Sequence, residues 1–373
     1  MELQTNSGQR FKRNSQLNSS HKIGLSKIYI MKKTTLFLAI YIILISLISC
    51  LGKENKPKRL IDMFQMDKSI THTEIQTDFF NMPIDIQYYD NKLIVLDYDG
   101  ETYINIYDLS QNKKSLGFLS KGQGPNEATD APTSIFMIND TTMIWYDADR
   151  SIRQAIVSNK MDKLIRIDKK CELYRSKPIL RIVPIYPNKY VGVGLFEKGR
   201  YGLFDSIGNT IKYKYDYPND NMNCNPITKA IANQGGFLTN SLFTKFVFFG
   251  FSSEIIEFFK VKGLNDFQKT KEIHFNYAKY NCKETIPIME KEYHSIKDGC
   301  SSDRYIYFLF SEDNMDIMNN EGNIILVFDW NGNPIMKYHL DLKVSAITID
   351  KKDKFIYAIA DNPEGTLVSF KLK

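Results

Sequence analysis

From about residue 60 to the C-terminus, short runs of alternating apolar and polar residues are separated by clusters of Gly, Asn and Asp. Alternation with a period of two is typical of strands with one buried face, and the clusters are typical of tight turns. In six places, two strong runs follow each other closely enough to predict a hairpin. These are Leu93–Asp97 with Ile104–Leu109, Met143–Tyr146 with Arg153–Val157, Tyr190–Leu195 with Tyr201–Asp205, Phe246–Phe251 with Ile255–Phe259, Tyr305–Phe310 with Ile324–Trp330, and Phe355–Ala360 with Leu367–Leu372. Successive copies begin 47 to 59 residues apart, slightly more than the roughly 40–50 of familiar propeller blades.

Weaker strands flank the hairpins, as four-stranded blades require. Preceding strands are predicted at Ile84–Tyr88, Ser134–Ile138, Leu180–Ile185, Ala230–Phe237, Ile296–Ser301 and Val344–Asp350. Following strands are predicted at Ser115–Leu119, Lys163–Asp168, Ile211–Tyr217, Thr270–Phe275 and Ile335–Leu340. The pattern therefore predicts an all-β fold, a six-bladed β-propeller over residues 60–373.

The last repeat lacks its fourth strand, because the chain ends at Lys373 directly after the third. An unpaired strand edge invites aggregation, so a strand from the start of the domain should fill the gap. Thr73–Phe79 alternates suitably and is predicted to close the last blade. The alternatives are two β-sandwiches or an open β-solenoid, and neither accounts for the missing strand.

The N-terminal region carries an export signal. Met31-Lys32-Lys33 is followed by an apolar run from Leu36 to Ile48 and then by Ser49-Cys50. The run is too short to span a bilayer and suits a signal peptide. Leu47-Ile48-Ser49-Cys50 resembles the bacterial lipobox, in which the cysteine is acylated and becomes the first mature residue. We predict an extension at 1–30, a signal peptide at 31–49, lipidation of Cys50, and a tether at 50–59.

This interpretation places the protein in the cell envelope, anchored to a bacterial membrane, with the outer membrane favoured and the propeller in the periplasm or on the cell surface. The whole chain has 49 Lys and Arg against 43 Asp and Glu. Seven of the basic residues and one acidic residue precede Cys50, which leaves 42 of each sign in the mature part. A balanced chain has no bulk attraction for a phosphate backbone, so nucleic acid is not an expected partner.

Two segments carry a family resemblance. Phe118 to Glu127 reads Phe-Leu-Ser-Lys-Gly-Gln-Gly-Pro-Asn-Glu, and the second segment comprises Ile325–Pro334 with Ile347–Asp350 and Asn362–Glu364. The first resembles the G-x-G-P-x-E signature of Bacteroides-type propeller lipoproteins, although a glycine is commoner at the position of Asn126. The second resembles the end of the TolB-like six-bladed branch. The resemblance covers residues 60–373 and implies the architecture and the anchor, but no ligand.

The glycine-rich segment itself predicts a rigid turn between blades. Gly122 and Gly124 permit positive φ, whereas Pro125 fixes φ and removes a hydrogen-bond donor. A phosphate-binding loop is the alternative, but a third glycine and a following helix pattern are absent.

The sequence contains no H-E-x-x-H, no G-x-S-x-G and no Walker-type loop. Ser110 to Lys113 satisfies S-x-x-K, yet it lies in a predicted polar turn. His72, His274, His294 and His339 show no spacing typical of metal ligands. No cofactor is expected.

Two functions from different classes remain. The first is a binding or scaffolding propeller, expected to be monomeric, with a protein, peptide or glycan partner. The second is a metal-dependent hydrolase of lactones or esters, with an ion on the propeller axis. Its candidate ligands are Asp85, Asn233 and Asp298 on the first strands of three blades; the alternative is that these are surface turn residues.

Four cysteines remain after lipidation, namely Cys171, Cys224, Cys282 and Cys300. They are compatible with two disulfides in any of three pairings, or with buried free thiols. The phenylalanines of the fourth repeat are predicted to fill the space between neighbouring sheets.

Overall fold

The computed structural model of the protein describes residues 58–75, 80–173, 178–218, 224–278, 295–312, 321–360 and 365–372. The predicted extension, signal peptide and Cys50 lie outside these residues, as does most of the tether. Residues Pro57–Lys373 form one compact unit. Among the residues described, no helix is both long and apolar enough to cross a membrane.

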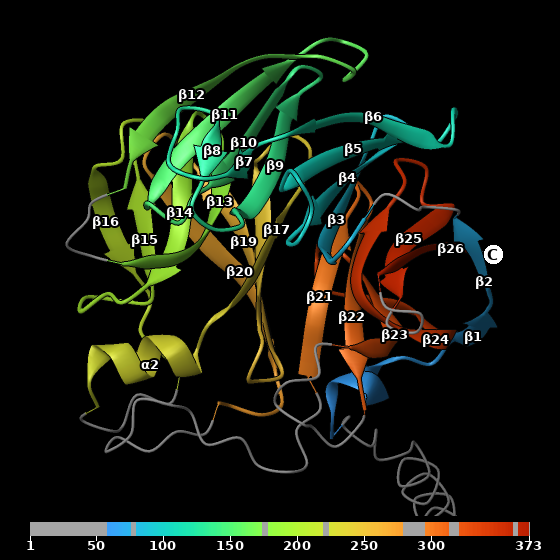
Figure 1. Ribbon diagram of the computed structural model, residues 1–373. Coiled ribbons are helices and arrows are strands. Elements are labelled where there is room, and N and C mark those ends of the chain that lie inside the picture. Colours follow the sequence, from blue (N-terminus) through green and yellow to red (C-terminus); the bar gives the residue numbers. More distant parts are fainter. Residues whose placement is uncertain are drawn as a thin grey trace, which may run out of the picture. The chain divides into compact units, whose positions relative to one another are not determined.

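Four blades are separate antiparallel sheets of four strands each (Figure 1). Blade 1 contains β3 (Pro83–Tyr89), β4 (Lys92–Asp97), β5 (Ile104–Asp108) and β6 (Lys113–Phe118). Blade 2 contains β9 (Thr133–Asn139), β10 (Thr142–Tyr146), β11 (Ser151–Val157) and β12 (Leu164–Glu172). Blade 3 contains β13 (Ile179–Ile185), β14 (Lys189–Gly194), β15 (Tyr201–Phe204) and β16 (Thr210–Lys214). Blade 4 contains β17 (Gly235–Thr239), β18 (Lys245–Gly250), β19 (Ile255–Lys262) and β20 (Asp266–His274).

Blades 5 and 6 are joined by a single long strand, β24 (Pro334–Ile349). Its first half completes blade 5 beside β21 (Ser295–Ser301), β22 (Tyr305–Ser311) and β23 (Gly322–Asp329). Its second half begins blade 6 beside β25 (Phe355–Ala360), which pairs in turn with β26 (Thr366–Lys371).

An N-terminal strand closes the last blade, as predicted. β2 (His72–Ile75) pairs antiparallel with β26, with His72 opposite Phe370 and Ile75 opposite Leu367. The rest of the predicted strand, residues 76–79, lies outside the described part. A second strand was not predicted: β1 (Asp67–Ile70) adds in parallel to the first half of β24. We call residues 67–75 the strap, because they contact both of the last two blades.

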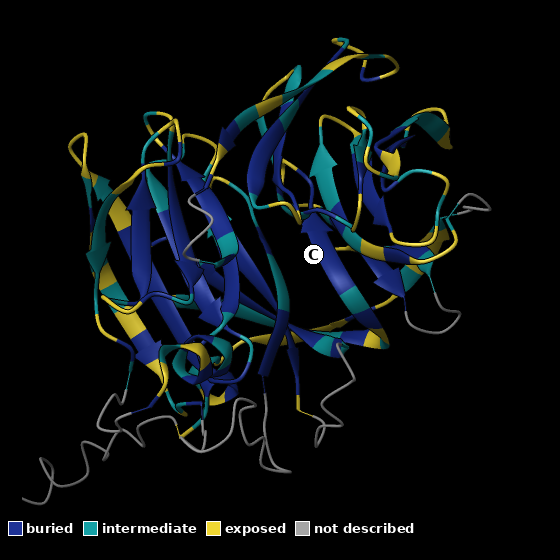
Figure 2. Ribbon diagram, turned by 60° about the vertical axis from the view of Figure 1, so that its left-hand side comes forward, coloured by how far each residue is buried: buried dark blue, intermediate teal, exposed yellow. Residues whose placement is uncertain are grey.

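Six apolar clusters hold the ring together, and in the described residues each cluster lies between two neighbouring blades. Strand β22 shows how alternation produces this arrangement. Tyr307 and Leu309 pack towards blade 6, whereas Ile306, Phe308 and Phe310 pack towards blade 4. Figure 2 shows that the strands are buried mainly in the interior of the sheets and exposed at the connections. The fourth-blade phenylalanines divide in the same way: Phe246, Phe248 and Phe259 face blade 3, and Phe249 and Phe258 face blade 5.

The first strands of neighbouring blades are also joined by hydrogen bonds between side chains and backbone. Gln87 donates to the Ile135 carbonyl, Ile182 N–H to Ser134 Oγ, Ser301 Oγ to the Thr239 carbonyl, Ile347 N–H to Asp298, and Tyr88 N–H to Thr348 Oγ1. These bonds span five of the six junctions in the described chain. At the sixth, between blades 3 and 4, a buried ion pair joins Arg200 Nη1 to Glu257 Oε2 at 2.7 Å.

One predicted strand is wrong in part. Residues 230–232, placed in the strand Ala230–Phe237, belong to helix α2 (Pro226–Ala232), and the strand begins only at Gly235. Asn225 caps the helix by accepting from Ile227 N–H, and Pro226 occupies its first turn. Both are helix-start signals. The short apolar run that follows is compatible with either structure by periodicity alone.

The two faces of the ring differ in the length of their connections. Within each antiparallel blade, the turns after the first and third strands share one face, the turn face, where connections have two to six residues. The connections between blades emerge on the opposite face, the loop face. Fourteen residues separate Phe118 from Thr133 there, and twenty separate Lys214 from Gly235. Long connections on one rigid face are where propellers and other scaffolds carry binding residues.

Candidate functional site

The G-x-G-P-x-E segment forms a closed loop on the loop face between blades 1 and 2. β7 (Ser120–Lys121) pairs in parallel with β8 (Glu127–Ala128) across it. The Glu127 carboxylate accepts from Gly124 N–H at 2.7 Å. Gly122 has φ +153°, and a Cβ there would lie 2.0 Å from that carboxylate. A side chain at position 122 would therefore have to displace the Glu127 carboxylate and adopt a φ that residues other than glycine rarely adopt.

Arg153 on β11 fastens this loop to blade 2. Its Nη1 donates to the Glu127 carbonyl at 2.7 Å and to Asp147 Oδ2 at 3.0 Å, and its Nη2 donates to the Pro125 carbonyl. The guanidinium also lies 5.6 Å from the ring centre of the buried Trp145. The segment thus forms the predicted turn between blades, and the Arg153 guanidinium holds two of its carbonyls.

The alternative of a phosphate-binding loop does not fit this geometry. The N–H groups of Gly122 and Glu127 are bonded to carbonyls of the loop itself, and that of Gly124 is bonded to the Glu127 carboxylate. A phosphate loop needs such groups directed at the ligand.

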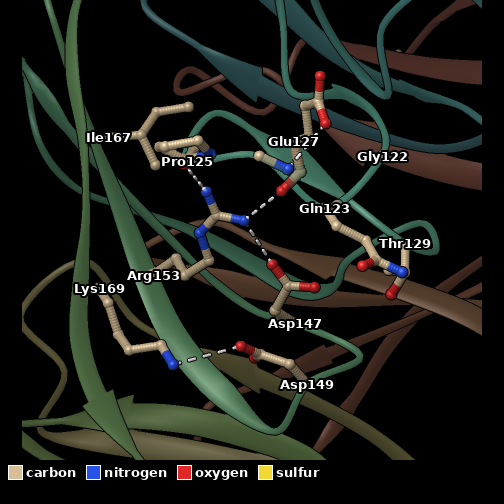
Figure 3. Close-up of a pocket in the computed structure, with 12 residues that line it drawn as sticks. Gly122, Gln123, Pro125, Glu127, Thr129, Asp147, Asp149, Arg153, Ile167 and Lys169 are labelled. Atoms are coloured by element: carbon tan, nitrogen blue, oxygen red, sulfur yellow. Dashed lines mark hydrogen bonds and ion pairs between the residues drawn. The ribbon is translucent and has the colours of Figure 1, made fainter.

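A pocket of about 460 Å³ opens beside this loop (Figure 3). It is lined by Gly122, Gln123, Gly124, Pro125, Glu127, Ala128, Thr129, Asp147, Asp149, Arg153, Ile167 and Lys169. Lys169 Nζ lies 3.4 Å from Asp149 Oδ2 and 2.7 Å from Glu172 Oε1. Exposed Gln123 and Thr129 have no hydrogen-bond partner for their side chains in the described part of the chain. Figure 3 shows these two on one side of the pocket and the Lys169–Asp149 pair on another.

Two of the three predicted axial residues do come together. Asp85 on β3 and Asp298 on β21 each follow an irregularity in strand pairing, and so does Arg181 on β13. A β-bulge re-aims the next side chain. The same irregularity in three alternate blades brings Asp85 within electrostatic range of both Arg181 and Asp298.

The protein environment shifts the pKa of both axial carboxyls upward. Burial raises the pKa of Asp85 to about 6, against the opposing effects of the Ile86 N–H and the Arg181 charge. Burial and, next, the Asp85 charge raise the pKa of Asp298 to about 8, although Asp298 accepts from Ile347 N–H at 2.8 Å. Asp298 is therefore mostly neutral at pH 7.

The third predicted ligand, Asn233, is not on a strand. It is the C-cap of α2, where its amide donates to the Lys229 carbonyl at 2.9 Å. The axial set is thus two carboxyls, one of them mostly protonated, beside a guanidinium. Divalent cations need several oxygen donors in their charged or carbonyl form, and a neighbouring arginine opposes them. No group of three or more His, Cys, Asp or Glu suitable for a metal occurs among the described residues.

Three of the four histidines that were considered as metal ligands lie in the described residues, each on a different strand. His72 pairs with Asp341 at 3.1 Å, His274 with Glu272 at 3.3 Å, and His339 lies 3.8 Å from Asp67. His294 lies outside the described residues. Ser110, the first residue of S-x-x-K, is in the turn after β5 and donates to Asp108.

The cysteines are of two kinds. Cys171 and Cys300 are buried free thiols, whereas Cys224 is disulfide-bonded. Burial raises the pKa of Cys171 to about 11 and raises that of Cys300 well above its usual value. Neither thiol is therefore poised as a nucleophile. Cys282 lies outside the described residues.

The sequence interpretation missed Arg153 and Arg181. Arg153 shares the face of β11 with Ala155 and Val157, both fully buried. A charged residue at an inward position of a strong strand is a signal of a buried partner, and it could have identified Arg153. Arg181 gives no such signal, because only the bulge before it determines where it points.

Comparisons with known proteins agree with this fold. A family model described as TolB-like 6-blade propeller-like matches residues 63–352. The chain is similar to the structure of a member of the DUF4221 family from Bacteroides vulgatus, with 12% identity, a TM-score of 0.52, and coverage of 82% of this chain and 96% of that one. It is also similar to a calcium-binding protein, regucalcin, from Agrobacterium tumefaciens, with 8% identity, a TM-score of 0.46, and coverage of 83% and 97%. The chain matches no curated protein.

Proposed function

The chain belongs to the TolB-like six-bladed propeller family, and on this premise we propose that it is a lipid-anchored propeller that binds a ligand or partner through its loop face. The observation that carries the proposal is the pocket beside the Gly122–Glu127 loop, which Arg153 holds in place through two backbone carbonyls of the loop. A site that is ordered in advance binds without the entropy cost of ordering its own loops.

The lining of the pocket supports binding over catalysis. Lys, Arg and Asp side chains are present, but no histidine, serine or cysteine of the described chain lines it. The acidic and basic groups are engaged with each other, as in Arg153 with Asp147 and Lys169 with Asp149. A serine or cysteine nucleophile with an adjacent histidine base, an arrangement typical of acyl transfer, is not among these described residues.

The point where the chain enters the propeller supports an orientation towards the membrane. Arg59 lies 3.4 Å from Glu312, which directly follows β22 at the loop face. The next residues form η1 (Leu60–Met63), and Leu60 and Ile61 are buried between blades 4 and 5. Nine residues lead from Cys50 to Arg59, a reach of about 30 Å when fully extended. An acylated Cys50 would therefore keep the loop face within that distance of the bilayer.

Site-specific crosslinking in intact cells tests this function. Replacing Gln123 by the photoreactive p-benzoylphenylalanine places the probe in the pocket, and the same replacement of Leu264 is the matched control. Leu264 is 70% exposed and lies in the turn between β19 and β20, on the turn face. We expect adducts from position 123 and few from position 264. Equal labelling at both positions, or none at 123, would contradict a loop-face binding site.

A further inference from the structure

We propose that the loop-face pocket takes a neutral, hydroxyl-rich ligand, that is, a carbohydrate. The inference rests on the proposed function, because it names the ligand class of the same pocket. It is carried by two features of the described residues: the charges around the pocket are already paired, and the remaining groups both donate and accept hydrogen bonds.

The pairing of charges disfavours an anionic ligand. All the described contacts of the Arg153 guanidinium are to protein groups: two carbonyls of the loop, Asp147 and the face of Trp145. Lys169 lies between Asp149 and Glu172. A phosphate or carboxylate ligand would have to displace one of these acidic groups, and it would meet Glu127 as well. Burying an uncompensated charge is costly, so a neutral ligand fits better.

The groups left for a ligand match hydroxyls. The amide of Gln123 and the hydroxyl of Thr129 can each donate and accept. Asp149 and Lys169 keep side-chain exposures of 50% and 44%, so their outer lone pairs and protons remain accessible. One sugar hydroxyl can donate to the Asp149 carboxylate and accept from the Lys169 ammonium, which leaves the ion pair intact. Ile167 and Pro125 lie together on another side of the pocket and offer contact to the C–H faces of a sugar ring (Figure 3).

A peptide strand fits less well. Strand addition needs an open row of backbone groups, but β7 and β8 pair with each other across the loop. The N–H groups of Gly122, Gly124 and Glu127 are also occupied. The volume of about 460 Å³ is within the range of roughly 300–1,000 Å³ for small-ligand sites.

The test is a glycan array probed with the mature protein, followed by calorimetric titration and Trp fluorescence. Trp145, one of two tryptophans, lies 5.6 Å from the Arg153 guanidinium, so its share of the emission reports on the pocket. We expect neutral oligosaccharides to bind more tightly than uronic acids or sugar phosphates. The double variant Gln123→Ala/Thr129→Val should weaken binding at least tenfold. Asn126→Ala is the matched control, because Asn126 is exposed in the same loop but does not line the pocket.

The outcomes separate the ligand class from the function. No neutral glycan bound on the array, or tighter binding of the charged sugars with the same dependence on Gln123 and Thr129, would overturn the carbohydrate assignment. The binding function would survive either result if position 123 still gave adducts in cells. Binding that is equally weakened by Asn126→Ala would place the ligand elsewhere and overturn the assignment of the pocket.

Discussion

Arginines add polar contacts between particular blades to the hydrogen bonds that join the first strands. Arg153 holds the exit loop of blade 1, Arg200 joins blade 3 to Glu257 of blade 4, and Arg181 lies within electrostatic range of Asp85 across the ring. Burying a charged pair does little for net stability, but leaving one partner alone is strongly destabilising. These residues therefore matter chiefly as specific links between particular blades.

Arg153→Met should destabilise the propeller by about 3 kcal/mol, because two loop carbonyls and Asp147 lose their donor in a buried site. Urea denaturation followed by circular dichroism measures the change. Arg166→Met is the control: Arg166 is 62% exposed and pairs with Asp168 on the surface, so its loss should cost under about 1 kcal/mol. Equal costs for the two variants would show that the Arg153 contacts do not hold the loop.

Asp298→Asn should change how stability depends on pH. The pKa of Asp298 is raised from 3.8 to about 8 in the fold. Because its pKa is higher in the folded than in the unfolded protein, the neutral Asp298 carboxyl makes a stabilising contribution to the free energy of unfolding. That contribution is fully present below about pH 4 and is lost as the pH rises through about 8. Asparagine keeps an acceptor for Ile347 N–H but has no proton to lose. Relative to wild type, we expect the variant to gain about 4 kcal/mol in free energy of unfolding between pH 5 and pH 9.

Urea titrations at the two pH values measure this difference. Asp162→Asn is the control, because Asp162 is on the surface and its pKa is lowered by Ser158 rather than raised. A wild type whose stability does not fall towards pH 9, or a variant that falls equally, would show that Asp298 is not held in its neutral form.

At the scale of elements, the strap is what turns five complete blades and one incomplete blade into a closed ring. β2 supplies the fourth strand of blade 6, and β1 pairs with the neighbouring half of β24. A hydrogen bond between His72 and Asp341 and an ion pair between Lys337 and Asp67 add contacts along it. These pairs are partly exposed and are individually weak; the backbone pairing and the buried Leu60, Ile61 and Ile70 provide most of the stabilisation.

Deleting residues 60–75 should abolish cooperative unfolding, because β24 and β26 would each lose a paired neighbour and the apolar cluster between blades 4 and 5 would lose Leu60 and Ile61. Deleting residues 1–56, which precede the compact unit, should leave the transition intact. Thermal melting of the two variants compares them. A variant lacking residues 60–75 that melts like the intact protein would refute closure by this segment.

At the scale of the whole molecule, the two faces of the ring have different lengths of connection, and the chain enters at the loop face. The pocket and the entry point of the chain thus share one face of the ring.

Cys50→Ser should release the protein from the membrane fraction, since two or more acyl chains anchor stably and an exported domain without them does not stay bound. Fractionation followed by immunoblotting measures the shift, and Cys171→Ser, at a buried free thiol, is the control. Retention of the Cys50 variant in membranes at the wild-type level would show that the lipobox is not the anchor.

The sequence by itself determined the features that depend on local patterning. Alternation marked the strong strands of all six hairpins, the missing last strand implied closure near Thr73, and the glycines with Pro125 marked the turn between blades. These features follow from side-chain period, turn chemistry and edge pairing, which act over a few residues. The family resemblance agreed with the same architecture.

Only the tertiary structure decided which distant residues meet. The partners of Arg153, the parallel pairing of β1 and the continuation of β24 through two blades involve groups far apart in the chain. The bulges before Asp85, Arg181 and Asp298 place these side chains together, and a shift of one residue would reverse their direction. The start of α2, by contrast, is indicated in the sequence by Asn225 and Pro226. Asn233 does not join Asp85 and Asp298 near the axis, because it caps the end of that helix. Sites assembled from several blades depend on register and long-range packing, which no local pattern encodes.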